Sequence, residues 1–241
     1  MLRLALIAGA ILVVTLGFSQ EKILQVPHRH QVYGMPDWTG GRTFEVVVDG
    51  VLVEKSILYA SCWPVCMTGI LVYCGQLAND NGGFSSEVAR QYDFYADFDD
   101  GAHSWMIPDY LAKYYPDLSC ELVDVSDLKL WTSERKWALV CDSIDHGWPV
   151  IASIGWVKPR GNIFGHAIVL RGYESVAQTA IVNDPAGSFT MTGRWDSSIT
   201  GESLKYRYND FFDRRFLIVV PIERKAELDA MIVRYSPPQP P

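Results

Sequence analysis

Residues 62–75 read CWPVCMTGILVYCG, and they begin an apolar stretch that continues to Ala78. Pro64 stands in what would be the first turn of a helix, a position that tolerates proline because no helical hydrogen bond is lost there. Gly75 stands near the other end, where glycine commonly terminates a helix. The pattern predicts a buried helix over Pro64–Ala78, with Cys62 at its start.

Cys62 is a candidate nucleophile because of this position. The start of a helix carries unsatisfied backbone N–H groups and the positive end of the helix dipole, and both favour a thiolate over a thiol. A thiolate nucleophile needs a histidine base, which the fold and not the local sequence must supply. The alternative is that Cys62 forms half of a disulfide.

The other elements follow from residue spacing. Helical spacing is found in Trp105–Tyr115 and in Ser133–His146, and a hairpin with an Asp-Gly turn is predicted over Phe44–Val53. Runs rich in β-forming residues are Pro149–Trp156, His166–Tyr173, Ala177–Asn183 and Arg215–Pro221. Because the helices come first and the strands follow without alternation, this order predicts an α+β fold.

Two polar residues lie at the ends of neighbouring predicted strands. His166 begins one apolar strand, and Asp184 directly follows the next. If the two strands pair through the Gly172–Val176 turn, both side chains fall at the same edge of the sheet. His166 would then be the base and Asp184 the group that fixes its tautomer. Alternatively, His166 only caps a strand, Asp184 only forms a turn, or Asn183 takes the orienting role.

Three segments resemble a known family. CWPVCMTGILVYCG is similar to the cysteine segment of bacterial papain-like cysteine peptidases, relatives of the double-glycine leader peptidases that process bacteriocins (peptidase family C39). The matching positions in this segment are Cys62, Pro64, Leu71, Tyr73 and Gly75, and the departures are Val65 and Gly69. GHAIVLRGY, residues 165–173, and VNDPAG, residues 182–187, resemble the histidine strand and the aspartate turn of the same family.

The resemblance implies a papain-like fold, in which a helix carrying the cysteine packs on an antiparallel sheet. It implies that Cys62 is the nucleophile, His166 the base and Asp184 the orienting residue. The segment LQVPHRHQ, residues 24–31, is similar to the family's opening and makes Gln31 the candidate for stabilising the oxyanion. In leader peptidases this glutamine lies six residues before the cysteine, where this chain has Ser56.

The first nineteen residues resemble a secretory signal peptide. One cation, Arg3, precedes the apolar run 4–18, and the small residues Gly17 and Ser19 stand where a signal peptidase cleaves. The run is shorter than the roughly 20 residues of a transmembrane helix, so no stable membrane span is expected after cleavage. We expect a signal peptide over residues 1–19, one peptidase domain over 20–235, a disordered proline-rich tail over 236–241, and a secreted or periplasmic location.

Export makes the five cysteines informative, because thiols outside the cytoplasm tend to pair. Cys66 and Cys74 would lie on one helix about 12 Å apart, too far for a disulfide with each other. With Cys62 free, this favours disulfides from Cys66 and Cys74 to Cys120 and Cys141 in an undefined order. The alternative is that some of these cysteines are buried thiols.

Composition excludes several functional classes. With 49% hydrophobic residues among 241, the chain is not intrinsically disordered. A net charge of −7 without a long basic run makes nucleic acid an unexpected partner. The His28-Arg29-His30 segment hints at a metal, but histidines in such a loop are usually solvated, and the proposed chemistry needs no metal or organic cofactor.

These observations predict an exported cysteine peptidase that cleaves a peptide or protein substrate through a thioacyl-enzyme intermediate. Two alternatives stay open. One is a peptidase-like binding module without turnover, and the other is an acyl transferase of the transglutaminase or cell-wall amidase type.

Overall fold

The structure is a computed structural model of the whole chain. It describes residues 21–29, 43–48, 51–56, 62–94, 104–127, 129–157, 163–189, 195–196, 200–208 and 212–237. The predicted signal peptide, Gln31 and most of the predicted tail lie outside these residues.

One antiparallel sheet organises the described part of the chain, and seven strands contribute to it in the order β10-β7-β6-β5-β11-β4, with β1 added beside β6. These strands are β1 (Glu21–Ile23), β4 (Leu118–Asp124), β5 (Val150–Val157), β6 (Ile163–Glu174), β7 (Thr179–Asn183), β10 (Leu204–Arg207) and β11 (Phe212–Pro221). Two small ribbons lie apart from it: β2 (Thr43–Val48) with β3 (Val51–Ser56), and β8 (Ser188–Phe189) with β9 (Trp195–Asp196).

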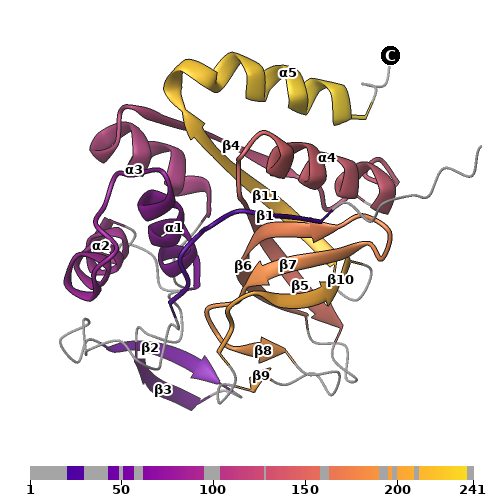
Figure 1. Cartoon of the computed structure of the whole chain (residues 1–241). Coiled ribbons are helices and arrows are strands. Elements are labelled where there is room, and N and C mark those ends of the chain that lie inside the picture. Colours follow the sequence, from indigo (N-terminus) through magenta and orange to yellow (C-terminus); the bar gives the residue numbers. More distant parts are fainter. Residues whose placement is uncertain are drawn as a thin grey trace, which may run out of the picture.

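The helices form two groups around this sheet (Figure 1). The first group, at the left of Figure 1, contains α1 (Cys62–Tyr73), α2 (Asn81–Phe94) and α3 (Ile107–Tyr114), and α1 packs on β6. The second group contains α4 (Ser133–Asp145) and α5 (Lys225–Tyr235), which pack on one another and on the sheet. Short 3₁₀ turns, Ser104–Met106 and Ile222–Arg224, precede α3 and α5.

Strand β6 is the centre of the fold because it pairs with three strands. Its first part pairs with β5 as far as Leu170, and from Gly172 onward β1 takes the place of β5. The register with β7 shifts between Leu170 and Gly172. A Cβ at Gly172 would lie 2.5 Å from the carbonyl oxygen of Lys22, so only glycine lets β1 approach this closely.

The helix that bears the cysteine is buried along most of its length. Met67, Ile70 and Leu71 have no exposed surface, and they join the core formed by sheet residues such as Ile168 and Leu170. Burying each such side chain stabilises the fold by about 1.5–3 kcal/mol. The burial fixes the position of α1 on β6 and therefore the position of its first residue.

The prediction of an α+β, papain-like fold is confirmed, with a cysteine-bearing helix packed on an antiparallel sheet. The bounds of that helix were predicted wrongly. It runs from Cys62 to Tyr73 and not over Pro64–Ala78. Gly75, with φ of +74°, ends it, and the amides of Gly75 and Gln76 bond back to the carbonyl groups of the last turn.

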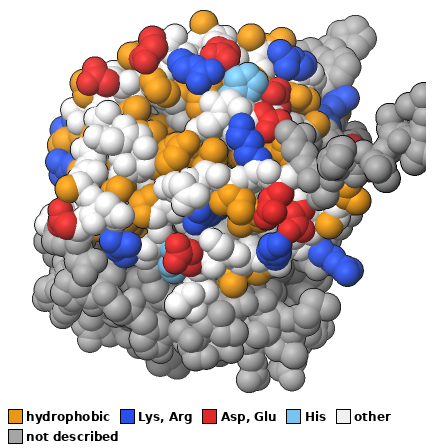
Figure 2. All heavy atoms as spheres, viewed as in Figure 1, with side chains coloured by type: hydrophobic (Ala, Val, Ile, Leu, Met, Phe, Trp, Pro, Cys, Tyr) orange, Lys and Arg blue, Asp and Glu red, His pale blue; other side chains and the backbone are white. Residues whose placement is uncertain are grey.

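The hairpin predicted over Phe44–Val53 is present as the antiparallel strands β2 and β3. The hairpin is longer than predicted, because it begins at Thr43 and ends at Ser56. Two helices, α2 and α5, and five strands, β1, β4, β8, β9 and β10, were not predicted from the sequence. In the described part of the chain, no helix has both the length and the apolar character needed to cross a bilayer. Acidic and basic side chains are interspersed over the described part of the face in Figure 2.

Candidate active site

Cys62 is the first residue of α1 and the point where this buried helix reaches the surface. Its side chain is half-buried, while the residues that follow it, from Trp63 to Leu71, are buried. The N-terminal amides of a helix have no intrahelical partners, so the Cys62 sulfur lies beside uncompensated N–H dipoles.

His166 lies on β6, against which α1 packs, and it joins the cysteine to a carboxylate. Its side chain is 6% exposed, and Nε2 lies 2.8 Å from Oδ1 of Asp184. Cys62 is the second neighbour of the imidazole and contributes to raising the pKa of His166. Because Nε2 is occupied by Asp184, Nδ1 is the ring nitrogen left for the thiol.

These two neighbours set the protonation of the histidine. Burial by itself would lower the pKa of His166, since it disfavours the charged ring. The Asp184 charge and hydrogen bond, together with the smaller contribution of Cys62, outweigh burial and raise the pKa of His166 to about 10. The imidazole is therefore held as a cation between a carboxylate and the cysteine sulfur.

Asp184 directly follows β7 and is fully buried. Oδ1 accepts hydrogen bonds from His166 and from the backbone amide of Ala186 at 2.9 Å, and Oδ2 accepts one from the Tyr206 hydroxyl at 3.0 Å. These donors compensate the buried carboxylate and fix its orientation toward the histidine ring.

The backbone of Asp184 is held as tightly as its side chain. Its N–H donates to the carbonyl oxygen of Gly201 at 2.7 Å, and its own carbonyl oxygen lies 2.9 Å from Nε2 of His28. A Cβ on Gly201 would lie 1.7 Å from that same carbonyl oxygen. Any side chain at position 201 would therefore displace Asp184.

Asn183, the alternative orienting residue, is engaged away from the histidine. Its Nδ2 donates to the carbonyl oxygen of Val26 at 2.8 Å, and its Oδ1 accepts from the Ser203 amide at 3.2 Å and from Arg171 at 3.4 Å. The side chain thus joins β7 to the segment after β1, and Asp184 is the residue that reaches His166.

The fourth predicted residue, Gln31, lies outside the described residues. Ser56, at the family's usual position for that glutamine, ends β3. In the described region, the Cys62 amide at the N-terminus of α1 is a donor placed beside the sulfur, where an oxyanion would develop.

All five cysteines lie in the described part of the chain, and all are free thiols, so the predicted disulfides are not confirmed. The Cys66 thiol donates to the Ala167 carbonyl at 3.4 Å. Burial raises the pKa of Cys66 well above its usual value, that of Cys74 to about 11, and those of Cys120 and Cys141 to about 12.

His28 does not behave as the sequence indicated. It is part-buried and bonded to Asp184 instead of being solvated, and burial is the main cause that lowers its pKa. Among the described residues, no group of three or more His, Cys, Asp or Glu side chains is arranged to hold a metal ion. His28, Tyr206 and Gly201 are the supporting residues that sequence reasoning missed.

Comparison with curated proteins finds none that matches the chain. A family model, described as the Peptidase_C39 like family, matches residues 23–212, which include the helix, the strand and the turn of the site. The chain therefore belongs to the Peptidase_C39 like family, which is of the cysteine peptidase kind.

Proposed function

We propose that the protein is an exported cysteine peptidase that uses Cys62, His166 and Asp184 as its catalytic triad. One observation carries the proposal: Nε2 of His166 lies 2.8 Å from Oδ1 of Asp184, and Cys62, at the start of the helix packed on the same strand, is near enough to the imidazole to contribute to its raised pKa. Family membership supports hydrolysis of a peptide bond as the reaction.

In the proposed reaction, the Cys62 thiolate attacks the carbonyl carbon of the scissile bond and forms a C–S bond. The C–N bond breaks, and the proton of the His166 imidazolium passes to the leaving amine. Water then attacks the thioacyl carbon while His166 accepts its proton, the C–S bond breaks, and the acid product leaves. Water is the only co-reactant, and the enzyme returns to its starting state.

The environment of His166 suits both of its roles. The raised pKa keeps the ring protonated at neutral pH, so that it can donate to the leaving amine. Asp184 orients the ring through Nε2, which leaves Nδ1 as the ring nitrogen available to Cys62. Because Tyr206 and Ala186 compensate the carboxylate, the orientation is held in the absence of substrate.

The oxyanion would be stabilised by the Cys62 backbone N–H and, as the family resemblance implies, by the Gln31 side chain. A Gln31→Ala substitution tests the second donor. We expect kcat to fall by about 10²–10³-fold with little change in KM, because the lost hydrogen bond forms only in the transition state. An unchanged kcat would remove Gln31 from the site.

The central experiment compares the wild-type chain with Cys62→Ala and with Cys141→Ala, a matched control at another half-buried cysteine. Each protein is incubated with peptides and proteins from outside the cytoplasm, and products are identified by mass spectrometry. We expect the Cys62 variant to lose about 10⁴-fold or more of the activity and the control to keep it. Identical products from wild type and Cys62→Ala would contradict the proposal.

The same assay separates the alternative functions. Transfer of the acyl group to an added amine without net hydrolysis would indicate a transferase. Absence of any product, together with alkylation of Cys62 no faster than that of the other cysteines, would indicate a binding module.

Export is a separate part of the proposal, supported by the character of residues 1–19. It is tested by N-terminal sequencing of the protein recovered from outside the cytoplasm. We expect a mature chain that begins near Gln20. Recovery of the protein from the cytoplasm with Met1 still in place would contradict export.

A further inference from the structure

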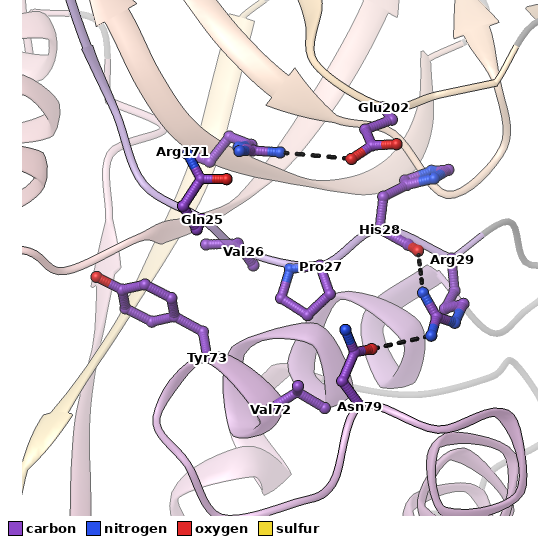
Figure 3. A pocket seen from close by; sticks show the side chains of 10 residues that line it. All are labelled: Gln25, Val26, Pro27, His28, Arg29, Val72, Tyr73, Asn79, Arg171 and Glu202. Carbon is purple, nitrogen blue, oxygen red and sulfur yellow. Dashed lines mark hydrogen bonds and ion pairs between the residues drawn. The ribbon is translucent and has the colours of Figure 1, made fainter.

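A concave site lies at the opposite end of α1 from Cys62. It is an open pocket of about 600 Å³, drawn in Figure 3, and its lining comes from the segment Gln25–Arg29, the end of α1, Asn79, Arg171 and Glu202. Val72 lines the pocket ten residues after Cys62, so about 15 Å of helix separates this part of the pocket from the proposed nucleophile. The volume is in the range of small-molecule sites.

Arg171 is the most unusual side chain in this pocket, because it is only 5% exposed. Its Nε donates to the Leu24 carbonyl at 2.7 Å, whereas Nη1 makes only long contacts, at 3.4 Å to Asn183 and 3.3 Å to Ser203. No described residue accepts a hydrogen bond from Nη2. Burial lowers the pKa of Arg171, so the environment compensates its charge incompletely.

The pocket contains one carboxylate, and Arg171 holds it only loosely. Glu202 is 58% exposed, and its Oε1 lies 3.9 Å from Nη1, beyond hydrogen-bond distance (dashed line in Figure 3). A pair of this kind is weak, because water competes for the exposed partner. A carboxylate thus already lies near the guanidinium edge without being fixed there.

The balance of charge in the pocket is positive. Arg29 is a second cation; it bonds to Asn79 through Nη2 at 2.9 Å, and its buried Nε has no hydrogen-bond partner. His28 adds no charge at neutral pH, because burial lowers its pKa below the ordinary value. Two arginines against Glu202 leave one excess positive charge in a pocket of small-molecule size.

We propose that this pocket binds a small organic carboxylate, whose oxygens take the Nη edge of Arg171 and displace Glu202. A planar guanidinium pairs with a carboxylate through two parallel N–H donors, which fixes the orientation of the ligand. Val26, Pro27 and Val72 line the same pocket and provide contacts for an apolar part of the ligand. The inference does not depend on peptidase activity.

The test measures binding calorimetrically with N-acetyl-dialanine, which has a free C-terminal carboxylate, and with the corresponding C-terminal amide. We expect saturable binding of the acid and none of the amide. Glu202→Gln removes the competing carboxylate and should tighten binding by about two- to fivefold. Glu223→Gln, the same change at an exposed residue that does not line the pocket, should leave the affinity unchanged.

Arg171→Lys keeps the positive charge but loses the two parallel N–H donors of the guanidinium. It should therefore weaken binding of the acid by about tenfold or more. A thermal melt shows whether this variant is folded, and Glu202→Gln keeps the proposal testable if it is not. To exclude binding at Cys62, the titration is repeated after alkylation of this residue, and the affinity should not change.

Four results would each overturn the proposal: equal binding of acid and amide, equal binding of inorganic phosphate, loss of binding on alkylation of Cys62, or the same affinity for Glu202→Gln and Glu223→Gln.

Discussion

At the scale of single residues, the site depends on how Asp184 and Cys62 together set the protonation of the His166 imidazole. Burial opposes the charge on His166, and the carboxylate of Asp184 contributes most to restoring it. Since Asp184 is itself fully buried, its charge acts on the ring with little screening by solvent. The state of the histidine is therefore controlled by one residue eighteen positions along the chain.

We expect Asp184→Asn to change the pH dependence of activity. Asparagine keeps an oxygen acceptor for Nε2 but removes the charge, so the raised pKa of His166 should fall from about 10. A histidine acts as the acid only below its pKa, so the alkaline limb of kcat/KM against pH should move to lower pH by roughly 1–3 units. An alkaline limb that stays in place would show that the carboxylate charge does not set this pKa.

Tyr206→Phe tests the second oxygen of the same carboxylate. The hydroxyl is 3.0 Å from Oδ2, and its removal leaves a buried, charged acceptor with one donor fewer. We expect a loss of about 1–3 kcal/mol in the free energy of unfolding, measured by urea denaturation, and reduced kcat. Tyr114→Phe on α3 is the matched control and should change neither quantity. Equal effects of the two variants would contradict the role of Tyr206.

At the scale of elements, the helix that begins with Cys62 is joined to its neighbours by a buried polar network. Gln91 on α2 donates to Thr68 on α1 at 2.9 Å and to Glu87 at 3.2 Å. The Tyr110 hydroxyl on α3 donates to Glu87 at 2.6 Å, and Arg90 pairs with the same carboxylate. Burial, followed by the hydrogen bond to Glu87, raises the pKa of Tyr110, so this hydroxyl stays a donor.

Glu87→Gln should weaken this network without changing its shape. An amide offers one acceptor oxygen instead of two, and its NH₂ group faces the donors of Arg90. We expect a loss of about 1–3 kcal/mol in the free energy of unfolding, measured by urea denaturation. Glu223→Gln, an exposed change of the same kind, should stay within about 0.5 kcal/mol. A Glu87 variant as stable as this control would show that hydrophobic packing alone holds the three helices together.

The same network explains why α2 could not be predicted from the sequence. Its sequence NGGFSSEVARQYDF begins with two glycines after asparagine, and among the side chains of α2 that the structure describes, Phe84 and Val88 are the buried apolar ones. These two pack in a small cluster with Val65. The stability of α2 comes from contacts with residues distant in sequence, and the periodicity of its own sequence does not indicate these contacts.

The three residues of the proposed triad could be singled out from the sequence because each lies where an element begins or ends: Cys62 at the start of a helix, His166 early in a strand and Asp184 after one. His28 and Tyr206 carry no such local signal. His28 meets Asp184 across 156 positions of sequence, and Tyr206 is one residue of an ordinary alternating strand. Contacts of this kind follow only from the assembled sheet.

At the scale of the whole molecule, the cysteines are distributed over the helical group, the sheet and α4. Cys66 and Cys74 lie in and just after α1, Cys120 lies on β4, and Cys141 lies on α4. The sequence favoured disulfides that would tie these parts together, whereas the structure has five free thiols. If the thiols stay free, packing of the core and not covalent linkage holds the molecule together.

Thiol counting distinguishes these two states of the molecule. In protein purified without reductant and unfolded in guanidinium, we expect a disulfide-exchange reagent to detect five thiols. In the folded protein at neutral pH, Cys62 should react alone in a fast phase, because it is half-buried at the N-terminus of α1 beside the His166 cation, whereas burial raises the pKa of each of the other thiols. The raised pKa of Cys74, about 11 against an ordinary 9, lowers its thiolate fraction by about a hundredfold. Cys62→Ala should abolish the fast phase and leave four slowly reacting thiols. A count of three or fewer thiols in the unfolded wild type would mean that disulfides form, and would contradict the structure with five free thiols.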